Sequence, residues 1–308
     1  MIDTVGIKIG HAQADNTGCS VFLLPEGSVA SVDVRGPAPG SRESALLQPT
    51  KPIMSVNAIL LTGGSALGLA AADGVMRWHV DRDIGHVTPI RKIPLVPTSV
   101  VYDLFFNMGQ TIPNAEMGYA ACENAAENNE RQGNVGAGAG VTVGKWGGFP
   151  GFMKGGFGLA AHQEGELRVF AAAVVNAVGD VVAEDGSVLA GAVKPDGDFR
   201  VADNPFRLFG GNSPTNMTNT TLVVVGTNAR LDKVQCNRLA HRAHDGMAMA
   251  IRPIHTSHDG DTAYAVSTGA VDVPFDWTAN IGAELVAAAI RSAIRHSVTV
   301  NGVRGLAS

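Results

Sequence analysis

The sequence predicts an α+β protein in which stacked β-sheets are covered by helices. Many of its β-branched runs carry apolar residues on both faces, so both faces of these strands are expected to be buried. Four longer segments instead repeat apolar residues at helical spacing and have one apolar side. At 308 residues, 45% of them hydrophobic, the chain can bury a large core. These features together favour a layered sandwich, built as a single domain, over a barrel or a bundle.

The expected elements follow from the two periodicities and from the turn residues between them. Runs rich in β-branched and aliphatic residues predict strands at 20–24, 29–34, 57–62, 99–105, 156–161, 169–175, 187–193, 221–227 and 262–268. Apolar residues spaced along one side predict helices at 66–80, 115–128, 232–251 and 280–297. Asp232 is placed to act near the N-terminus of the third helix. Pro, Gly and Asn cluster in 194–218, which predicts a connector that ends immediately before Asn219.

Composition and charge exclude several classes of partner. The net charge is −5 and only 17% of residues are charged, with no basic block, so we expect no nucleic-acid partner. The most apolar uncharged stretch, 52–72, carries polar residues and glycines in its middle, so we expect no membrane span. The three cysteines are far apart and fit neither a disulfide framework nor a zinc pattern. Since the chain also starts without the pattern of a signal peptide, we expect a cytoplasmic protein.

Two glycine-rich motifs come close to established active-site signatures but miss them. The run 136–145 would need Gly at Ala139 and Ser or Thr at Trp146 to be a phosphate-binding loop. The turn at Ser65 would need a second Gly at Leu67 to be the nucleophile elbow of a serine hydrolase. We expect a tight strand-to-helix turn there, with Ser65 as the helix N-cap.

A group of histidines supplies metal-ligand types within about twenty residues. Its members are His241, His244, His255 and His258. The first two share one side of a helix, as a zinc pair does, but the set matches no defined zinc or calcium spacing. A metal site is therefore the weaker interpretation, and we expect neither metal nor cofactor.

Two carboxylates flank a glycine at the turn Asp259-Gly260-Asp261, which enters the strand 262–268. Carboxylates aimed at one place repel each other unless a cation or hydrogen-bond donors hold them. Lys145 would be a suitable companion for this pair.

The dipeptide Asn219-Thr220 precedes the apolar run Thr221-Leu-Val-Val-Val. If its peptide bond were cleaved, Thr220 would carry both a hydroxyl and an α-amine, a nucleophile with its own base. An α-amine has a pKa of roughly 7.7 to 8.0, so much of it is deprotonated near neutral pH. Asn and Thr are also typical of a turn that opens an ordinary buried strand, and the local pattern alone favours that alternative.

Seven sequence segments, in order along almost the whole chain, instead favour self-cleavage over an ordinary buried strand. They are 17–27, 32–43, 59–77, 135–145, 174–181, 219–229 and 243–262. Together they resemble the self-processing aminopeptidases that include the L-aminopeptidase/D-amidase-esterases, the β-aminopeptidases and the nylon-oligomer hydrolases. The resemblance implies a four-layer αββα sandwich of the N-terminal-nucleophile hydrolase type. It also implies cleavage between Asn219 and Thr220 into parts 1–219 and 220–308, which stay together.

The resemblance further assigns roles to residues that match the family's motifs. Thr220 would be the nucleophile of both self-cleavage and an acyl-enzyme, with Lys145 placing positive charge beside it. Asp259 and Asp261 would orient and balance that lysine. Two further residues, Asn176 and Tyr102, match groups that line the site and would stabilise the developing oxyanion. From the residues alone, Asn176 is also consistent with the end of a buried strand, Tyr102 with a core residue and Lys145 with a solvated loop residue.

Three functions follow as alternatives. The first is an aminopeptidase or amidase-esterase that acts on small N-terminal residues of peptides, amides or esters. The second is an endo-acting hydrolase of linear 6-aminohexanoate oligomers, and the third is a non-catalytic small-ligand binder that never matures. Serine-nucleophile aminopeptidases of the family carry other residues where this chain has Asp259-Gly260-Asp261, so the threonine branch is closer and β-peptide cleavage is in particular doubt. The family also implies a homotetramer of processed units.

Overall fold

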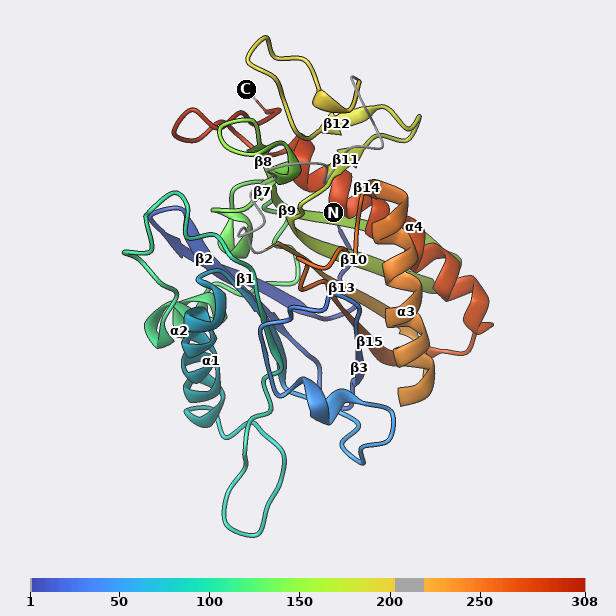
Figure 1. Ribbon diagram of the computed structural model, residues 1–308. Coiled ribbons are helices and arrows are strands. Elements are labelled where there is room, and N and C mark those ends of the chain that lie inside the picture. The colour runs from blue at the N-terminus through green and yellow to red at the C-terminus, as the bar shows by residue number, and fades with distance from the viewer. Residues whose placement is uncertain (1, 203–218, 308) are drawn as a thin grey trace.

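Two five-stranded sheets form the centre of the computed structural model, which describes residues 2–202 and 219–307 (Figure 1). Sheet A has the order β1 (Lys8–Ala14), β2 (Thr17–Leu23), β5 (Ala58–Thr62), β6 (Thr98–Val100) and β4 (Ser41–Arg42). Sheet B has the order β3 (Val29–Val34), β15 (Thr262–Val271), β13 (Thr220–Ala229), β10 (Leu167–Asn176) and β9 (Gly156–Glu164). Most of the predicted connector lies outside the described residues.

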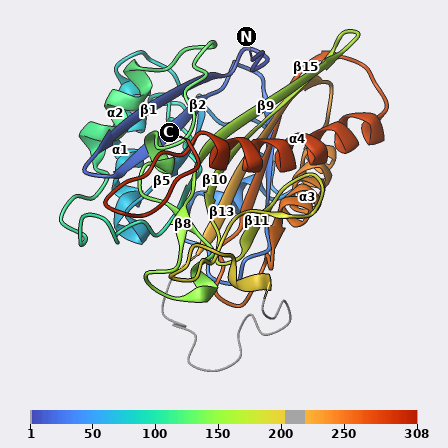
Figure 2. The ribbon, with the colours of Figure 1, turned by 90° about the horizontal axis from the view of Figure 1, so that it is seen from above.

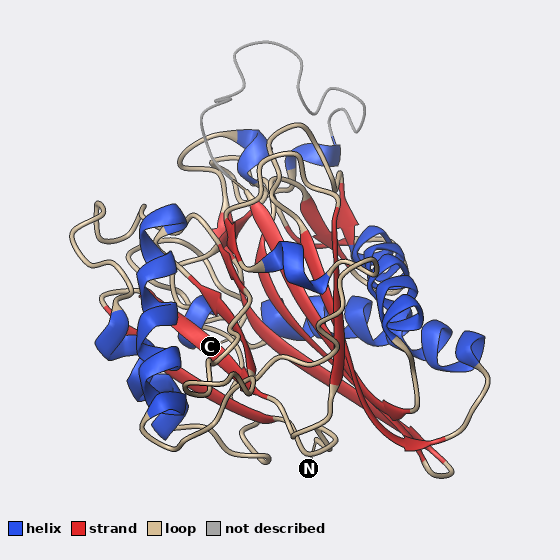
Figure 3. Cartoon of the chain, turned by 90° about the horizontal axis from the view of Figure 1, so that it is seen from below, coloured by secondary structure: helices blue, strands red, loops and turns tan. Residues whose placement is uncertain are grey.

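Helices cover the outer face of each sheet. Sheet A carries α1 (Ala71–Val80) and α2 (Ala115–Glu123), and sheet B carries α3 (Lys233–Ala250) and α4 (Phe275–Arg295) (Figure 3). Small sheets join β12 (Val188–Ala190), β11 (Asp180–Val182) and β14 (Ile251–Arg252), and β7 (Thr142–Val143) with β8 (Met153–Lys154). Short 3₁₀ helices are η1 (Ser44–Leu47), η2 (Ser65–Ala70), η3 (Gly136–Gly138), η4 (Lys145–Gly147) and η5 (Arg200–Ala202).

Three separate apolar cores define the layers. One lies between the two sheets, one between sheet B and its helices, and one between sheet A and its helices. On β13, Leu222 and Val224 belong to the inter-sheet core, while Val223 and Val225 belong to the core under α3 and α4. This alternation is the period of a strand that is buried on both faces. The predicted four-layer αββα sandwich is therefore confirmed (Figure 2).

Strand register brings the ends of three strands of sheet B together. β10 runs antiparallel to β13 and places Asn176 opposite Thr220. β13 runs parallel to β15 and places Leu222 beside Thr262. The end of β10 and the starts of β13 and β15 therefore lie at the same end of the sheet. Asp259 and Asp261 lie there as well.

The helix boundaries depend on local capping. Asp232 accepts a hydrogen bond from the Gln235 backbone N–H while the Gln235 side chain accepts one from the Asp232 backbone, so the predicted role of Asp232 is confirmed. The prediction for Ser65 is wrong. Ser65 is the first residue of η2, with a φ of 54° and no side-chain capping bond, because Gly64 occupies the cap position.

Several predicted boundaries are also wrong. The strand expected at 99–105 ends at Val100, where the chain leaves sheet A for a turn. The helix expected at 115–128 ends at Glu123, and the last helix begins at Phe275, directly after Pro274. Strand β1 was not predicted. It pairs with β2 along its whole length, and its polar C-terminal half carries little of the apolar pattern from which strands are predicted.

The run 136–145 packs inside the protein and does not form an anion-binding loop. A Cβ atom at Gly136 would lie 2.3 Å from the Ser20 hydroxyl, and the Gly136 and Ala137 N–H groups donate to Gln13 and Ser20. These amides are therefore already occupied by protein acceptors. Within 2–202 and 219–307, no helix has the length and apolarity that crossing a membrane requires.

Candidate active site

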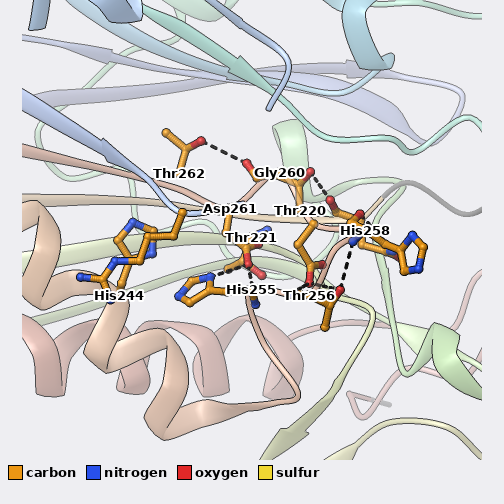
Figure 4. Close-up of polar contacts among 12 residues, drawn as sticks. Thr220, Thr221, His244, His255, Thr256, His258, Gly260, Asp261 and Thr262 are labelled. Carbon is orange, nitrogen blue, oxygen red and sulfur yellow. Dashed lines mark hydrogen bonds and ion pairs between the residues drawn. The ribbon is translucent and has the colours of Figure 1, made fainter. Parts of the chain in front are cut away.

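Thr220 is the first residue of β13 and is almost completely buried. Its hydroxyl donates to the carbonyl oxygen of Asn219, so the hydroxyl lies against the peptide group that precedes it. The same carbonyl oxygen accepts the backbone N–H of Gly260 at 2.8 Å. Figure 4 shows Thr220 and Gly260 side by side in this arrangement. Two donors on one carbonyl oxygen polarise the carbonyl and favour a negative charge there.

Gly260 is required by close approach. A Cβ atom at this position would lie 2.7 Å from the Ala38 carbonyl oxygen and 2.8 Å from the Thr220 hydroxyl oxygen. Any larger residue would therefore displace either the Thr220 hydroxyl or the Gly260 N–H.

We expect Gly260→Ala to slow cleavage at Asn219–Thr220 by about 10²- to 10³-fold, the usual cost of losing one oxyanion donor. Intact mass at timed intervals after purification measures this rate. Gly282→Ala is the matched control, because its Cβ would also be crowded, but by Leu239 and Val225 side-chain atoms in the core under α4. Equal cleavage rates in Gly260→Ala and wild type would exclude a role for the Gly260 N–H.

Lys145 lies in η4, immediately after Gly144, whose φ of 75° turns the chain toward the end of β10. Its Nζ donates to both the backbone oxygen and the side-chain oxygen of Asn176, each at 2.8 Å. Because Asn176 is directly opposite Thr220 in the antiparallel pair, their side chains share one face of sheet B. The three residues that the sequence predicts to act together are therefore neighbours.

Burial lowers the pKa of Lys145 to about 7, although the charges of Asp259, Asp261 and Asp103 oppose this shift. A neutral lysine amine has two N–H donors and one lone pair. Both donors are used by Asn176, so the lone pair of the neutral form is free to accept a proton. The family resemblance implies a positive charge at Lys145, and the fully buried amine could also act as a base near pH 7.

The two acids differ in their surroundings. Asp259 accepts hydrogen bonds from the backbone N–H and the hydroxyl of Thr256, at 2.7 and 2.6 Å. Burial, followed by the charge of Asp261, raises its pKa. Asp261 accepts the backbone N–H of Thr221 at 2.6 Å and two further donors from His255. Asp261 is thus bound to the backbone of the residue next to Thr220, while Asp259 and Lys145 interact through their charges.

Tyr102 contributes its backbone rather than its hydroxyl. Its carbonyl oxygen accepts the Asn176 side-chain N–H at 3.0 Å, and its side chain is partly exposed. Its hydroxyl forms no hydrogen bond within the described part of the chain. The structure therefore places the Tyr102 backbone at the site.

Three of the predicted histidines contact two different carboxylates. His241 and His244 both contact Asp33, at 3.3 and 3.5 Å, whereas His255 contacts Asp261. In the described ranges, no group of three or more His, Cys, Asp or Glu side chains is arranged to hold a metal ion.

Sequence reasoning gave no role in the active site to three residues that contact it, namely Gly260, Thr256 and His255. All lie within one short turn beside the paired acids. Their proximity to those acids was visible in the sequence, but their hydrogen bonds depend on how the turn folds back on itself.

The whole chain matches a known protein family. The family model described as "Peptidase family S58" matches residues 1–307. An uncharacterized aminopeptidase of Mycobacterium tuberculosis (strain H37Rv) is 40% identical over 291 residues, which cover 88% of this chain and 82% of the relative. A 6-aminohexanoate-oligomer endohydrolase of Paenarthrobacter ureafaciens is 33% identical over 282 residues, covering 88% and 76% of the two chains.

Solved structures support the fold. A β-aminopeptidase of Burkholderia sp. superposes with a TM-score of 0.74 at 21% identity, covering 100% of this chain and 91% of that chain. The L-aminopeptidase D-Ala-esterase/amidase of Ochrobactrum anthropi, described as a variant of the Ntn hydrolase fold, superposes with a TM-score of 0.71 at 18% identity, covering 95% and 84%. At these identities the likeness shows the fold alone.

Proposed function

The chain belongs to peptidase family S58, and on that premise we propose that it cleaves its own Asn219–Thr220 bond and then acts through Thr220 as an N-terminal threonine hydrolase. That it hydrolyses peptide or amide bonds follows from the family and from its aminopeptidase relatives. The observation that carries the proposal is the contact of the Thr220 hydroxyl with the Asn219 carbonyl, whose oxygen also accepts the Gly260 N–H.

Self-cleavage would proceed as an acyl shift. The Thr220 hydroxyl oxygen attacks the Asn219 carbonyl carbon as its proton passes to neutral Lys145, and the Gly260 N–H stabilises the oxyanion. The C–N bond then breaks, the Thr220 nitrogen takes the proton back, and an ester joins the two residues. Water hydrolyses this ester, which leaves a carboxylate on Asn219 and a free α-amine on Thr220.

Turnover would use the same hydroxyl with a new base. The free α-amine of Thr220 takes the hydroxyl proton, the hydroxyl oxygen attacks a substrate carbonyl, and an acyl-enzyme forms as the amine or alcohol departs. One side-chain N–H of Asn176 donates to the Tyr102 carbonyl oxygen, so the other N–H remains available to donate to the substrate oxyanion. Lys145 and the two acids would balance the charge that moves through these steps. No metal or cofactor enters this mechanism.

The preferred substrates are small peptides, amides or esters with a free N-terminal residue. The endo-acting alternative rests on the nylon-oligomer relative, which is 33% identical. A homotetramer of processed units stays a prediction, which sedimentation equilibrium of the purified protein tests.

Two measurements on wild-type protein test this proposal. Intact mass under denaturing conditions is expected to show two pieces of roughly 22.6 and 9.2 kDa, the shares of residues 1–219 and 220–308 in a 31.8 kDa chain. Amino-acid p-nitroanilides and linear 6-aminohexanoate oligomers are then compared as substrates. Faster hydrolysis of the oligomers would favour the endo-acting alternative. An intact chain without activity on either would contradict the proposal.

A further inference from the structure

A second cluster of titratable side chains lies beside the candidate site, on the side of sheet B that faces α3. Asp261 is fully buried and lies two and four positions before Ala263 and Ala265, which belong to the core under α3 and α4. The cluster contains Asp261, His255 from the turn after β14, His244 from α3 and Asp33 from β3. Figure 4 shows His255 and His244 next to Asp261 and Thr221. The proposed mechanism gives neither histidine a task.

His255 forms two hydrogen bonds to one oxygen of Asp261. Its ring nitrogen Nδ1 lies 2.8 Å from Asp261 Oδ2, and its backbone N–H donates to the same oxygen at 3.1 Å. The other oxygen, Oδ1, accepts the Thr221 N–H at 2.6 Å. Three donors on two oxygens fix the plane of a carboxylate. His255 thereby determines where Oδ1 meets the backbone next to Thr220.

The backbone of His255 adopts a conformation that costs energy. Its φ of 56° lies in the left-handed region, which is unfavourable for a non-glycine residue. This conformation allows the N–H and the ring to reach the same Asp261 oxygen. Strain of this kind persists where surrounding contacts hold it, and it is frequent at functional sites.

His244 and Asp33 support the ring of His255 from behind. The two imidazole rings meet edge to face, with centroids 4.8 Å apart. The Nε2 atom of His244 lies 3.2 Å from the Asp33 carbonyl oxygen and 3.5 Å from its carboxylate. Burial, followed by the neighbouring His255, lowers the pKa of His244 to about 4, so it is neutral near pH 7. The uncharged His244 ring therefore packs against the His255 ring and holds its orientation.

We propose that His255, supported by His244 and Asp33, is a positioning residue that aims the Asp261 carboxylate at the Thr221 N–H and thereby fixes the Thr220 hydroxyl in its reactive orientation. This inference rests on the proposed function. His255 touches neither the scissile bond nor substrate in this arrangement, so it acts through Asp261. A displacement of about 1 Å at a reacting group is enough to cost 10²-fold in rate.

The test compares two substitutions that both tolerate a positive φ. His255→Asn keeps a side-chain N–H close to the position of Nδ1, whereas His255→Gly removes it. We expect His255→Gly to slow self-cleavage and to lower kcat about 10- to 100-fold with KM little changed. His255→Asn should retain most of the wild-type self-cleavage rate and kcat. His241→Asn is the matched control, because His241 contacts the same Asp33 from the exposed side, at 3.3 Å, and is expected to match wild type.

The outcomes separate this inference from the proposed function. If wild type and His255→Gly are cleaved and turn over equally, only the role of His255 is overturned. If the Asn and Gly variants are equally impaired, His255 contributes ring packing and the inference is again wrong. If His255→Gly does not fold, His255→Asp, which has the shape of Asn but a carboxylate in place of the donor amide, takes its place with the same expected loss relative to Asn. An uncleaved, inactive wild-type chain would overturn both proposals.

Discussion

Replacing Thr220 with Val is expected to leave the protein as one 31.8 kDa chain without hydrolase activity, whereas wild type is expected to separate into two pieces. Valine keeps the β-branched shape that suits the start of β13 but removes the hydroxyl that contacts the Asn219 carbonyl. Both proposed reactions would lose their nucleophile, so activity should fall by at least about 10⁴-fold. Denaturing mass spectrometry and a p-nitroanilide assay measure the two effects.

Thr221→Val is the matched control for this substitution. Thr221 is the next residue of the same strand, is equally buried, and points to the opposite face. Its hydroxyl has no hydrogen-bond partner among the described residues, so its removal should leave cleavage intact. Thr220→Ser adds a positive control, because serine retains a hydroxyl. Cleavage of Thr220→Val at Asn219 would rule out Thr220 as the maturation nucleophile.

Replacing Lys145 with Met is expected to slow self-cleavage by about 10²- to 10⁴-fold, the range that a general base contributes. The α-amine of Thr220 does not exist before cleavage, so no other base on Thr220 can substitute for Lys145 during maturation. Methionine preserves the length and apolar stem of the buried side chain. The rate is measured from the appearance of the roughly 9.2 kDa piece after dilution from a condition that arrests cleavage, such as low pH.

The pH dependence of maturation follows from the lowered pKa of Lys145. With a pKa of about 7, the amine is mostly neutral above pH 7 and increasingly protonated below it. Only the neutral form accepts a proton, so wild-type cleavage should fall about tenfold per unit well below pH 7 and level off above it. The Lys145→Met variant should lack this decline.

Lys154→Met is the matched control, since Lys154 is also fully buried and its pKa is likewise lowered to about 7 by burial. Its Nζ donates to the carbonyl oxygens of Ala139 and Val141 rather than to Asn176. We expect Lys154→Met to lower the melting temperature, because two carbonyls lose their donor, and to keep the wild-type pH profile. A wild-type profile in Lys145→Met would exclude Lys145 as the base.

Much of the layer structure could be predicted because its signals are local. Segments that are apolar on both faces, such as 221–227 and 169–175, lie in the centre of sheet B with both faces buried. The third helix begins where Asp232 caps it. The failures occurred where tertiary contacts override local preference. β1 has a polar half that is held by pairing with β2, and η2 begins at Ser65 because Gly64 makes the turn.

By itself the sequence determined a layered α+β sandwich through apolar periodicity, while its resemblance to a family implied the αββα order of the layers. Residue types and the same resemblance marked Asn219-Thr220 and the paired acids. It did not determine which atoms meet. Only the tertiary structure brought Lys145 onto Asn176, which is 31 positions later in the chain, and set Asn176 opposite Thr220 through strand register. Only the fold of the turn placed the Gly260 N–H on the Asn219 carbonyl and His255 on Asp261. The physical reason is that periodicity and capping act over a few neighbouring residues, whereas hydrogen bonds and pKa shifts depend on burial and on groups that the folded chain brings together from distant segments.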